Sequence, residues 1–127
     1  MVKVCKILLS INPIHVENIF NGTKEYEYRK VRCKGAVDKI LIYSTAPVMK
    51  VVGEAKVQEV IEDTPEAIWS KTSKKSGIEK CFFQKYYLGK EIAVAYKLKD
   101  IIKYKYPKEL SFYGITAAPQ SFVYLSK

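Results

Sequence analysis

The sequence contains few of the residues that build metal centres and catalytic triads. His15 is its only histidine, and its three cysteines, Cys5, Cys33 and Cys81, stand far apart with no Cys-x-x-Cys pair. A metal site is therefore not expected, and nothing indicates a cofactor. Serine- or cysteine-triad catalysis is not indicated either, since no serine or cysteine dyad accompanies this lone histidine on a predicted helix. An odd number of widely spaced cysteines is typical of free thiols in a reducing cytoplasm, which is the compartment we expect.

Long apolar runs and domain linkers are also missing. No apolar run approaches the roughly 20 residues that a membrane helix needs, so a membrane partner is not expected. No repeat, low-complexity tract or linker divides the 127 residues. This length suits a single domain over residues 1–127 with one hydrophobic core.

The charge is strongly one-sided. Lysine and arginine number 22 against 13 acidic residues, which gives a net charge of +9. Such an excess attracts polyanions, of which nucleic acid is the commonest in a cell. A basic composition can also exist without any nucleic-acid partner, so the charge raises this question and does not answer it.

Alternation, capping residues and breakers predict an α+β domain of five to six mixed strands with two to three flanking helices. Strands are expected over residues 6–11, 24–30, 39–44, 51–61, 91–104 and 120–125, and helices over 13–21, from about 63 to 72, and over 78–88. Gly53 interrupts the fourth predicted strand. A glycine there indicates a bulge or the close approach of another backbone, which bends a sheet toward a barrel.

The most informative segment is residues 10–29, which has the pattern of a strand end, a capped helix, a glycine stop and a second strand. Asn12 can accept hydrogen bonds from free N–H groups at the helix start, and Pro13 suits the first helical turn. Gly22 can adopt the left-handed conformation that ends a helix. A helix fixed at both ends in this way holds the following strand in place.

The strand that follows alternates in polarity. Tyr26 and Tyr28 point to one face, while Glu25, Glu27 and Arg29 point to the other. Charged side chains are thereby concentrated on one strand face beside the helix. This arrangement suggests a functional site.

The same segment resembles the signature of the ASCH domain, a branch of the PUA-like superfamily: Ser-Ile-x-Pro on a strand, a short helix, and then Gly-x-Lys-x-x-Glu-x-Arg. The matching residues are Ser10, Ile11, Pro13, Gly22, Lys24, Glu27 and Arg29. Three later segments, 42–45, 51–57 and 119–125, are also similar to that family. The resemblance implies a PUA-like open β-barrel with a pocket beside the first helix, and a role linked to RNA.

Three basic residues of this segment are candidates for contacts with a nucleic acid. Lys24 can donate to a phosphate or a base carbonyl, although a solvated strand lysine is the alternative. Arg29 offers a planar fork for phosphate or guanine, and Lys30 extends the basic edge. Glu27 is placed either to contact the ligand or to orient Arg29 through an ion pair.

Polar and aromatic residues on other elements complete the candidate site. Ser10 and Asn12 lie beside the charged strand in the implied fold, and helix capping alone explains Asn12. Tyr43 and Ser44 end the third strand, where a ring can stack on a base, although a core position for Tyr43 is equally consistent. Gln120 can read a base edge or hold the neighbouring loop.

Three functions from different classes remain open. The leading hypothesis is a module that binds RNA or another single-stranded nucleic acid in a basic cleft between the first helix and the second strand, and we expect a binding module rather than an enzyme. The enzymatic alternative, implied by the resemblance, is an amidohydrolase for acylated cytidine-type nucleosides, or a ribonuclease, that uses Lys24 with Glu27 as the proton-transfer pair. Glu25 and Glu27 stand where those amidohydrolases carry threonines. A regulatory protein-interaction module is the third possibility.

Overall fold

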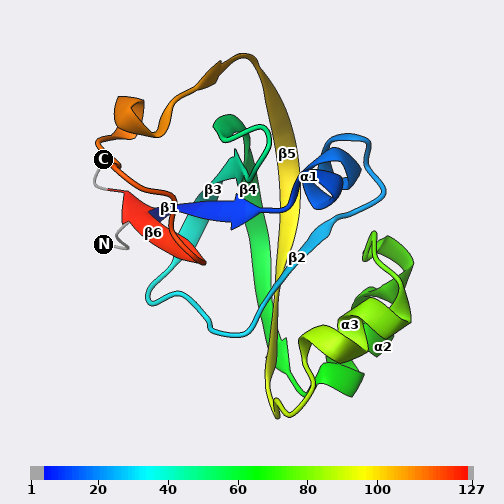
Figure 1. Ribbon diagram of the computed structural model, residues 1–127. Helices are drawn as coiled ribbons and strands as arrows, with labels where there is room; N and C mark the ends of the chain where they lie inside the picture. The colour runs from blue at the N-terminus through cyan, green and yellow to red at the C-terminus, as the bar shows by residue number, and fades with distance from the viewer. Residues whose placement is uncertain (1–4, 126–127) are drawn as a thin grey trace.

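The computed structural model describes residues 5–125 (Figure 1), which form one mixed sheet with three α-helices. The strands are β1 (Cys5–Ile11), β2 (Tyr26–Arg29), β3 (Val37–Ser44), β4 (Lys50–Asp63), β5 (Ala93–Lys108) and β6 (Phe122–Leu125). The helices are α1 (Pro13–Phe20), α2 (Pro65–Thr72) and α3 (Lys80–Tyr86), with 3-10 turns at Ser73–Lys75 and Leu110–Tyr113. The strand order is β2-β5-β4-β3-β1-β6, and only β1 and β3 run parallel among these pairs.

The α+β class, the six strands and the three helices agree with the prediction, but the barrel does not. In the described part of the chain, β2 and β6 are the two edges of the sheet and do not pair with each other. Each is only four residues long and pairs on one side alone. The sheet is therefore open, and closure into a barrel is not observed.

Several elements differ in length from the prediction, among them β5 and the third helix. β5 continues to Lys108 through Pro107, whereas a strand ending at residue 104 was expected. The C-terminal end of β5 still pairs with β4, Lys108 with Val51, but β2 pairs only with residues Val94 to Lys97 of β5. β2 therefore does not extend as far as Pro107. Because no strand pairs with β5 on that side at Pro107, the lack of a backbone N–H there can be tolerated. The third helix is shorter than expected and covers Lys80–Tyr86.

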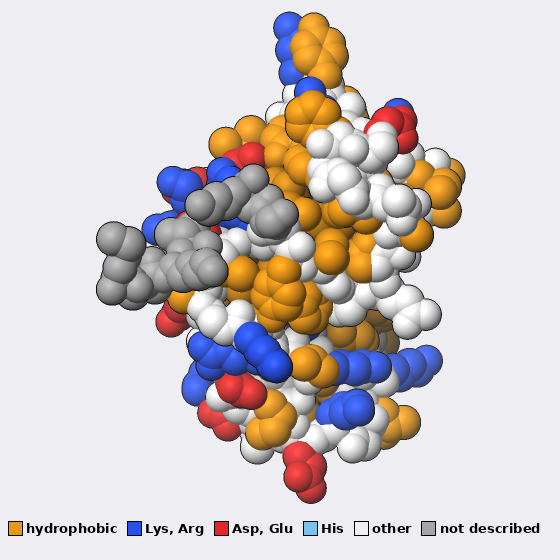
Figure 2. Space-filling model, turned by 90° about the vertical axis from the view of Figure 1, so that its left-hand side faces the viewer, with side chains coloured by type: hydrophobic (Ala, Val, Ile, Leu, Met, Phe, Trp, Pro, Cys, Tyr) orange, Lys and Arg blue, Asp and Glu red, His pale blue; other side chains and the backbone are white. Residues whose placement is uncertain are grey.

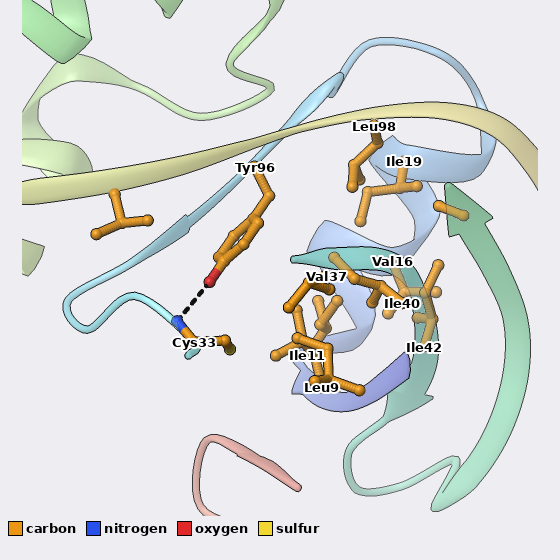
Figure 3. Close-up of a cluster of buried hydrophobic side chains, with 13 residues drawn as sticks. Leu9, Ile11, Val16, Ile19, Cys33, Val37, Ile40, Ile42, Tyr96 and Leu98 are labelled. Carbon is orange, nitrogen blue, oxygen red and sulfur yellow. Dashed lines mark hydrogen bonds between the residues drawn. The ribbon is translucent and has the colours of Figure 1, made fainter. Parts of the chain in front are cut away.

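The main core lies between the sheet and α1. Leu9, Ile40 and Ile42 of the parallel pair pack with Val16 and Ile19 of α1, as Figure 3 shows, and Ile7 belongs to the same cluster. Tyr96 of β5 reaches this cluster, and its hydroxyl accepts a hydrogen bond from the backbone N–H of Cys33 at 2.9 Å. Burial of these side chains fixes α1 on the sheet.

Gly53 has the close approach that the sequence predicts. A Cβ there would overlap the carbonyl oxygen of Ile102 and the ring of Phe20, the last residue of α1. The register of β4 against β5 also shifts between Val51 and Gly53. The absence of a side chain at this position therefore lets the end of α1 lie directly on the β4–β5 pair.

A second cluster fixes α2 and α3 against the other side of β2 and β5. Tyr26 and Tyr28 of β2 pack with Ile68 of α2, and with Phe83 and Tyr87 of α3. Figure 1 shows α2 and α3 together at one end of the long β4 and β5 strands. Within residues 5–125, no helix is both long and apolar enough to cross a bilayer.

Candidate functional site

A cavity of about 700 Å³ lies between α1, β2 and the segment that leads into α3. Its lining combines apolar and aromatic side chains with Ser10, His15, Lys24, Glu27 and Arg29. The sequence places a site between the first helix and the second strand, and α3 supplies a third wall that the sequence did not predict. Small-molecule and cofactor sites have this size and character.

Lys24 forms the floor of the cavity. Gly22, with φ +88°, ends α1, and the backbone N–H of Lys24 then donates to the carbonyl of Asn18 at 3.0 Å. The residue is only 2% exposed. Its Nζ donates to the carbonyl oxygen of Ser76 at 3.0 Å and lies 4.7 Å from the centre of the Tyr28 ring. Lys24 is thus a buried residue and not the solvated strand lysine of the alternative.

The segment before α3 pairs with Lys24 and packs closely against it. Lys24 and Ser76 form an isolated β-bridge, and Gly77 follows with φ +68°. A Cβ on Gly77 would overlap Cβ of Lys24. Only glycine satisfies both the backbone conformation and the packing at this position.

Burial lowers the pKa of Lys24. The nearby carboxylate of Glu27 opposes this shift, and the charge of Arg29 adds to it. Glu27 compensates Lys24 only partly, because its carboxylate is bound to Arg29. Among the described residues, no carboxylate lies within salt-bridge distance of Lys24.

Glu27 and Arg29 form a nearly buried ion pair, with Arg29 Nη2 at 3.0 Å from Glu27 Oε2 and side-chain exposures of 11% and 8%. Arg29 Nη2 also donates to the carbonyl oxygen of Ser10 at 2.9 Å. The orienting role is therefore the one observed for Glu27. Arg29 Nε is buried without a protein partner in the described structure.

Ser10 anchors the segment before β6 at the edge of the cavity. Its hydroxyl donates to the carbonyl of Pro119 at 2.7 Å, and its N–H donates to the carbonyl of Ser121 at 3.1 Å. Arg29 Nη1 reaches Ser121 Oγ at 3.5 Å. Gln120 is exposed and does not line the cavity. The segment contacts Ser10 and Arg29 through its backbone carbonyls and the side chain of Ser121.

Tyr43 and Ser44 lie elsewhere. Tyr43 is 2% exposed and packs with Leu8, Leu41 and Val51 in a separate cluster. Ser44 is equally buried at the end of β3 and does not line the cavity. The expectation of a stacking ring at Tyr43 is therefore wrong, and its core alternative is correct.

Apart from Tyr28 of β2, the phenyl and phenol rings of the cavity come from α3. Phe82, 47% exposed, and Tyr86 both line it. Lys30 is exposed at the end of β2, and its Nζ lies 4.7 Å from the centre of the Tyr86 ring. Asn12 lines the cavity and caps α1, its side-chain oxygen accepting from the N–H of Ile14 at 3.1 Å. The aromatic spacing of the predicted third helix is the signal that could have indicated these rings.

His15 is the residue that the sequence analysis set aside. It is half-buried on α1, lines the cavity, and packs edge-to-face against Phe82 with ring centres 5.3 Å apart. Its Nδ1 is buried without a protein partner in the described structure. Burial lowers the pKa of His15, and the charges of Lys24 and Arg29 add to the shift while Glu27 opposes it.

The donor set suits an organic ligand better than a metal. Across residues 5–125, no group of three histidine, cysteine, aspartate or glutamate side chains is arranged to hold a metal ion. The lining is mostly apolar and aromatic, with a few hydrogen-bond donors among these side chains. Such a cavity can bind a planar, polar molecule with acceptor atoms on its edge.

Comparisons with known proteins give a consistent family. A family model described as a domain of unknown function (DUF365) matches residues 10–120. The ASCH domain-containing ribonuclease of Zymomonas mobilis is 27% identical over 94 residues, which are 73% of this chain and 64% of that protein. The crystal structure of ASCH from Zymomonas mobilis superposes with a TM-score of 0.87 at 26% identity, covering 96% of this chain and 88% of that one.

A more similar sequence belongs to a longer protein. The large ribosomal subunit protein uL22 of Ureaplasma parvum serovar 3 is 37% identical over 120 residues. The match includes 94% of this chain but only 39% of that protein. The chain thus spans well under half the length of this curated relative.

Proposed function

This chain belongs to the DUF365 family and to the ASCH domains, and from that premise we propose that it binds single-stranded RNA and takes one nucleotide into the cavity between α1, β2 and α3. The ribonuclease of Zymomonas mobilis is a relative whose name refers to RNA. The net charge of +9 favours a polyanionic ligand. Figure 2 shows the β6 side of the molecule, turned away from α1 and α3, where Lys and Arg side chains also lie beside hydrophobic ones.

The observation that carries this proposal is the state of Lys24. An ammonium group has three donors, and the protein uses one of them for the carbonyl of Ser76. Its neighbouring carboxylate, Glu27, is bound to Arg29. A buried cation without a carboxylate partner is costly to the fold, and such groups are concentrated at functional sites. A ligand carbonyl or phosphate oxygen would supply the missing acceptors.

The walls of the cavity favour a nucleobase as the part of RNA that enters. Phe82 and Tyr86 present rings on the α3 side, on which a base can stack. Lys30 lies outside, against the Tyr86 ring, where it can meet the backbone phosphate. The base would thus lie inside and the charge of the RNA backbone would remain at the rim.

The test is RNA binding by a pair of variants with equal net charge. Lys24→Met removes the cavity ammonium and keeps the length of the side chain, and Lys99→Met removes an exposed lysine of β5 that does not line the cavity. Binding of short fluorescent single-stranded RNA is measured over a salt series. Loss of hydrogen bonds from a charged group predicts about 10- to 100-fold weaker binding for Lys24→Met and about twofold for Lys99→Met.

Equal losses in the two variants would mean that RNA is held by diffuse charge, and the cavity would not be the site. Absence of RNA binding by the wild type would overturn the proposal. Polyglutamate serves as the competing polyanion. If it binds as well as RNA and with the same salt dependence, a protein-interaction module becomes the better explanation.

RNA cleavage is a second candidate, favoured by the lowered pKa of Lys24. A desolvated lysine can exchange a proton with a reacting group more readily than an exposed one. The same RNAs, incubated with wild type and Lys24→Met, would reveal this activity as cleavage that only the wild type performs. Hydrolysis of acylated cytidine is examined with the same two proteins. It has less support because the carboxylate of Glu27, its second group, is held by Arg29.

A further inference from the structure

We infer that His15 is a specificity-determining residue, whose Nε2 donates a hydrogen bond to an acceptor atom on the edge of the bound nucleobase. This inference rests on the proposed function, because it assigns a role within the same cavity. Neither the family motif nor the sequence analysis assigns a role to this residue. It is carried by the position of the ring, by the partners of its two nitrogens and by its charge state.

The position of His15 follows from the two faces of α1. Val16 and Ile19 are buried in the core under the helix, while His15 and Asn18 line the cavity. Asn18 uses its amide to donate to the carbonyl of Gly77 at 3.2 Å, which ties α1 to the segment before α3. His15 has no such structural hydrogen bond from Nδ1. Its ring meets Phe82 edge-on, at 68° between the planes, and so stands across from α3.

The two nitrogens of the ring differ in their surroundings. Nδ1 is buried without a partner, so Nε2 is the nitrogen that can meet a ligand in the cavity. A neutral imidazole carries its proton on one nitrogen only. Unpaired buried N–H groups are rarer than unpaired buried acceptors. The favoured tautomer therefore leaves Nδ1 bare and places the proton on Nε2, which makes Nε2 a donor.

Burial, assisted by the charges of Lys24 and Arg29, lowers the pKa of His15 and so favours the neutral imidazole at physiological pH. Lys24 and Arg29 face it from the β2 side together with Glu27, and Glu79 and Cys81 line the cavity on the α3 side. A neutral donor does not select phosphate, whose charge is better met by lysine. It suits a base carbonyl or ring nitrogen, and discrimination between bases follows from where that acceptor lies.

Three substitutions separate the role of Nε2 from that of the ring. His15→Gln places an amide donor near the position of Nε2, His15→Asn places it near Nδ1, and His15→Phe keeps the ring without nitrogens. Binding of short oligouridylate, oligocytidylate and oligoadenylate is measured for each variant. We expect His15→Phe and His15→Asn to bind the preferred RNA roughly tenfold more weakly, with a smaller difference between the three RNAs, and His15→Gln to retain most of the preference.

The inference is overturned if His15→Phe binds all three RNAs as the wild type does while Lys24→Met has lost binding, because the cavity would then be the site without a role for the histidine. Equal weakening by all three variants, with the preference between RNAs unchanged, would also overturn it and leave a packing role. If Lys24→Met binds RNA as well as the wild type, the proposed function itself fails. Thermal unfolding of each variant verifies that the fold is retained.

Discussion

The ammonium of Lys24 and the carbonyl oxygen of Ser76 are 3.0 Å apart, although 52 residues separate them in the chain. This hydrogen bond joins the start of β2 to the segment that leads into α3. Together with the hydrogen bond from Asn18 to the carbonyl of Gly77, it makes one cavity from two parts of the sequence. The same lysine is a buried ammonium for which the described structure offers no carboxylate partner. One residue therefore both joins the walls of the cavity and places an uncompensated charge in it.

Lys24→Met is expected to stabilise the protein while it weakens RNA binding. Replacing a buried charge by an apolar group of similar volume is often neutral or stabilising, here by about 1 kcal/mol. The measurement is the free energy of unfolding in urea, beside the binding assay. Lys99→Met, at an exposed position, serves as the control and should change stability by less than about 0.5 kcal/mol. A Lys24→Met protein that is much less stable than the wild type would show that the ammonium is a structural group.

Gly77→Ala is expected to destabilise the fold by more than about 2 kcal/mol, because the new methyl group would overlap Cβ of Lys24 in a backbone with φ +68°. Gly35→Ala is the matched control. Gly35 has φ +74°, but nothing lies within 4 Å of the added Cβ, so only the conformational penalty of about 1 kcal/mol should appear. Urea unfolding of the two variants gives the difference. Equal losses in the free energy of unfolding would mean that the packing of Gly77 on Lys24 contributes little to stability.

The local part of the site was predictable from the sequence. Asn12, Pro13 and Gly22 are start and stop signals that act within one helix, and they place Lys24 shortly before β2. The ion pair of Glu27 with Arg29 is one of the two alternatives that their spacing on one strand left open. Each of these signals depends only on neighbours in the chain.

The rest of the site and of the fold depends on contacts between segments that are distant in the chain. No local pattern indicates that Ser76 and Gly77 meet Lys24, and so α3 was not expected as a wall of the cavity. Tyr43 was ambiguous because the second half of β3 is buried throughout, so polarity does not reveal which face a residue occupies. How far the sheet curls toward a barrel was not predictable, because edge pairing is a property of the whole sheet.

Removing Arg29 is expected to destabilise the protein strongly. Arg29→Met would leave the carboxylate of Glu27 buried without its partner, and breaking a buried ion pair in this way costs about 3–5 kcal/mol. The double variant Glu27→Gln/Arg29→Met removes both charges and should recover more than about 1 kcal/mol of that loss. A double-mutant cycle on urea unfolding measures the coupling. Additive losses would show that Glu27 and Arg29 act independently.

The stability of the wild type is expected to fall as the pH decreases below 6.5, through the titration of His15. Its pKa is lowered from the ordinary value of 6.5 in the folded protein, chiefly by burial. The unfolded chain therefore binds the proton first, and the free energy of unfolding decreases from pH 6.5 down to the folded-state pKa, below which the effect of this group is complete.

His15→Gln should remove that part of the pH dependence, because glutamine does not titrate. All other titratable groups are the same in the two proteins, so the difference between their stability curves isolates the contribution of His15. The measurement is urea unfolding of wild type and His15→Gln between neutral pH and the acid range. Parallel stability curves for the two proteins below pH 6.5 would contradict the prediction, since they would mean that the ring is protonated equally easily in the folded and unfolded chain.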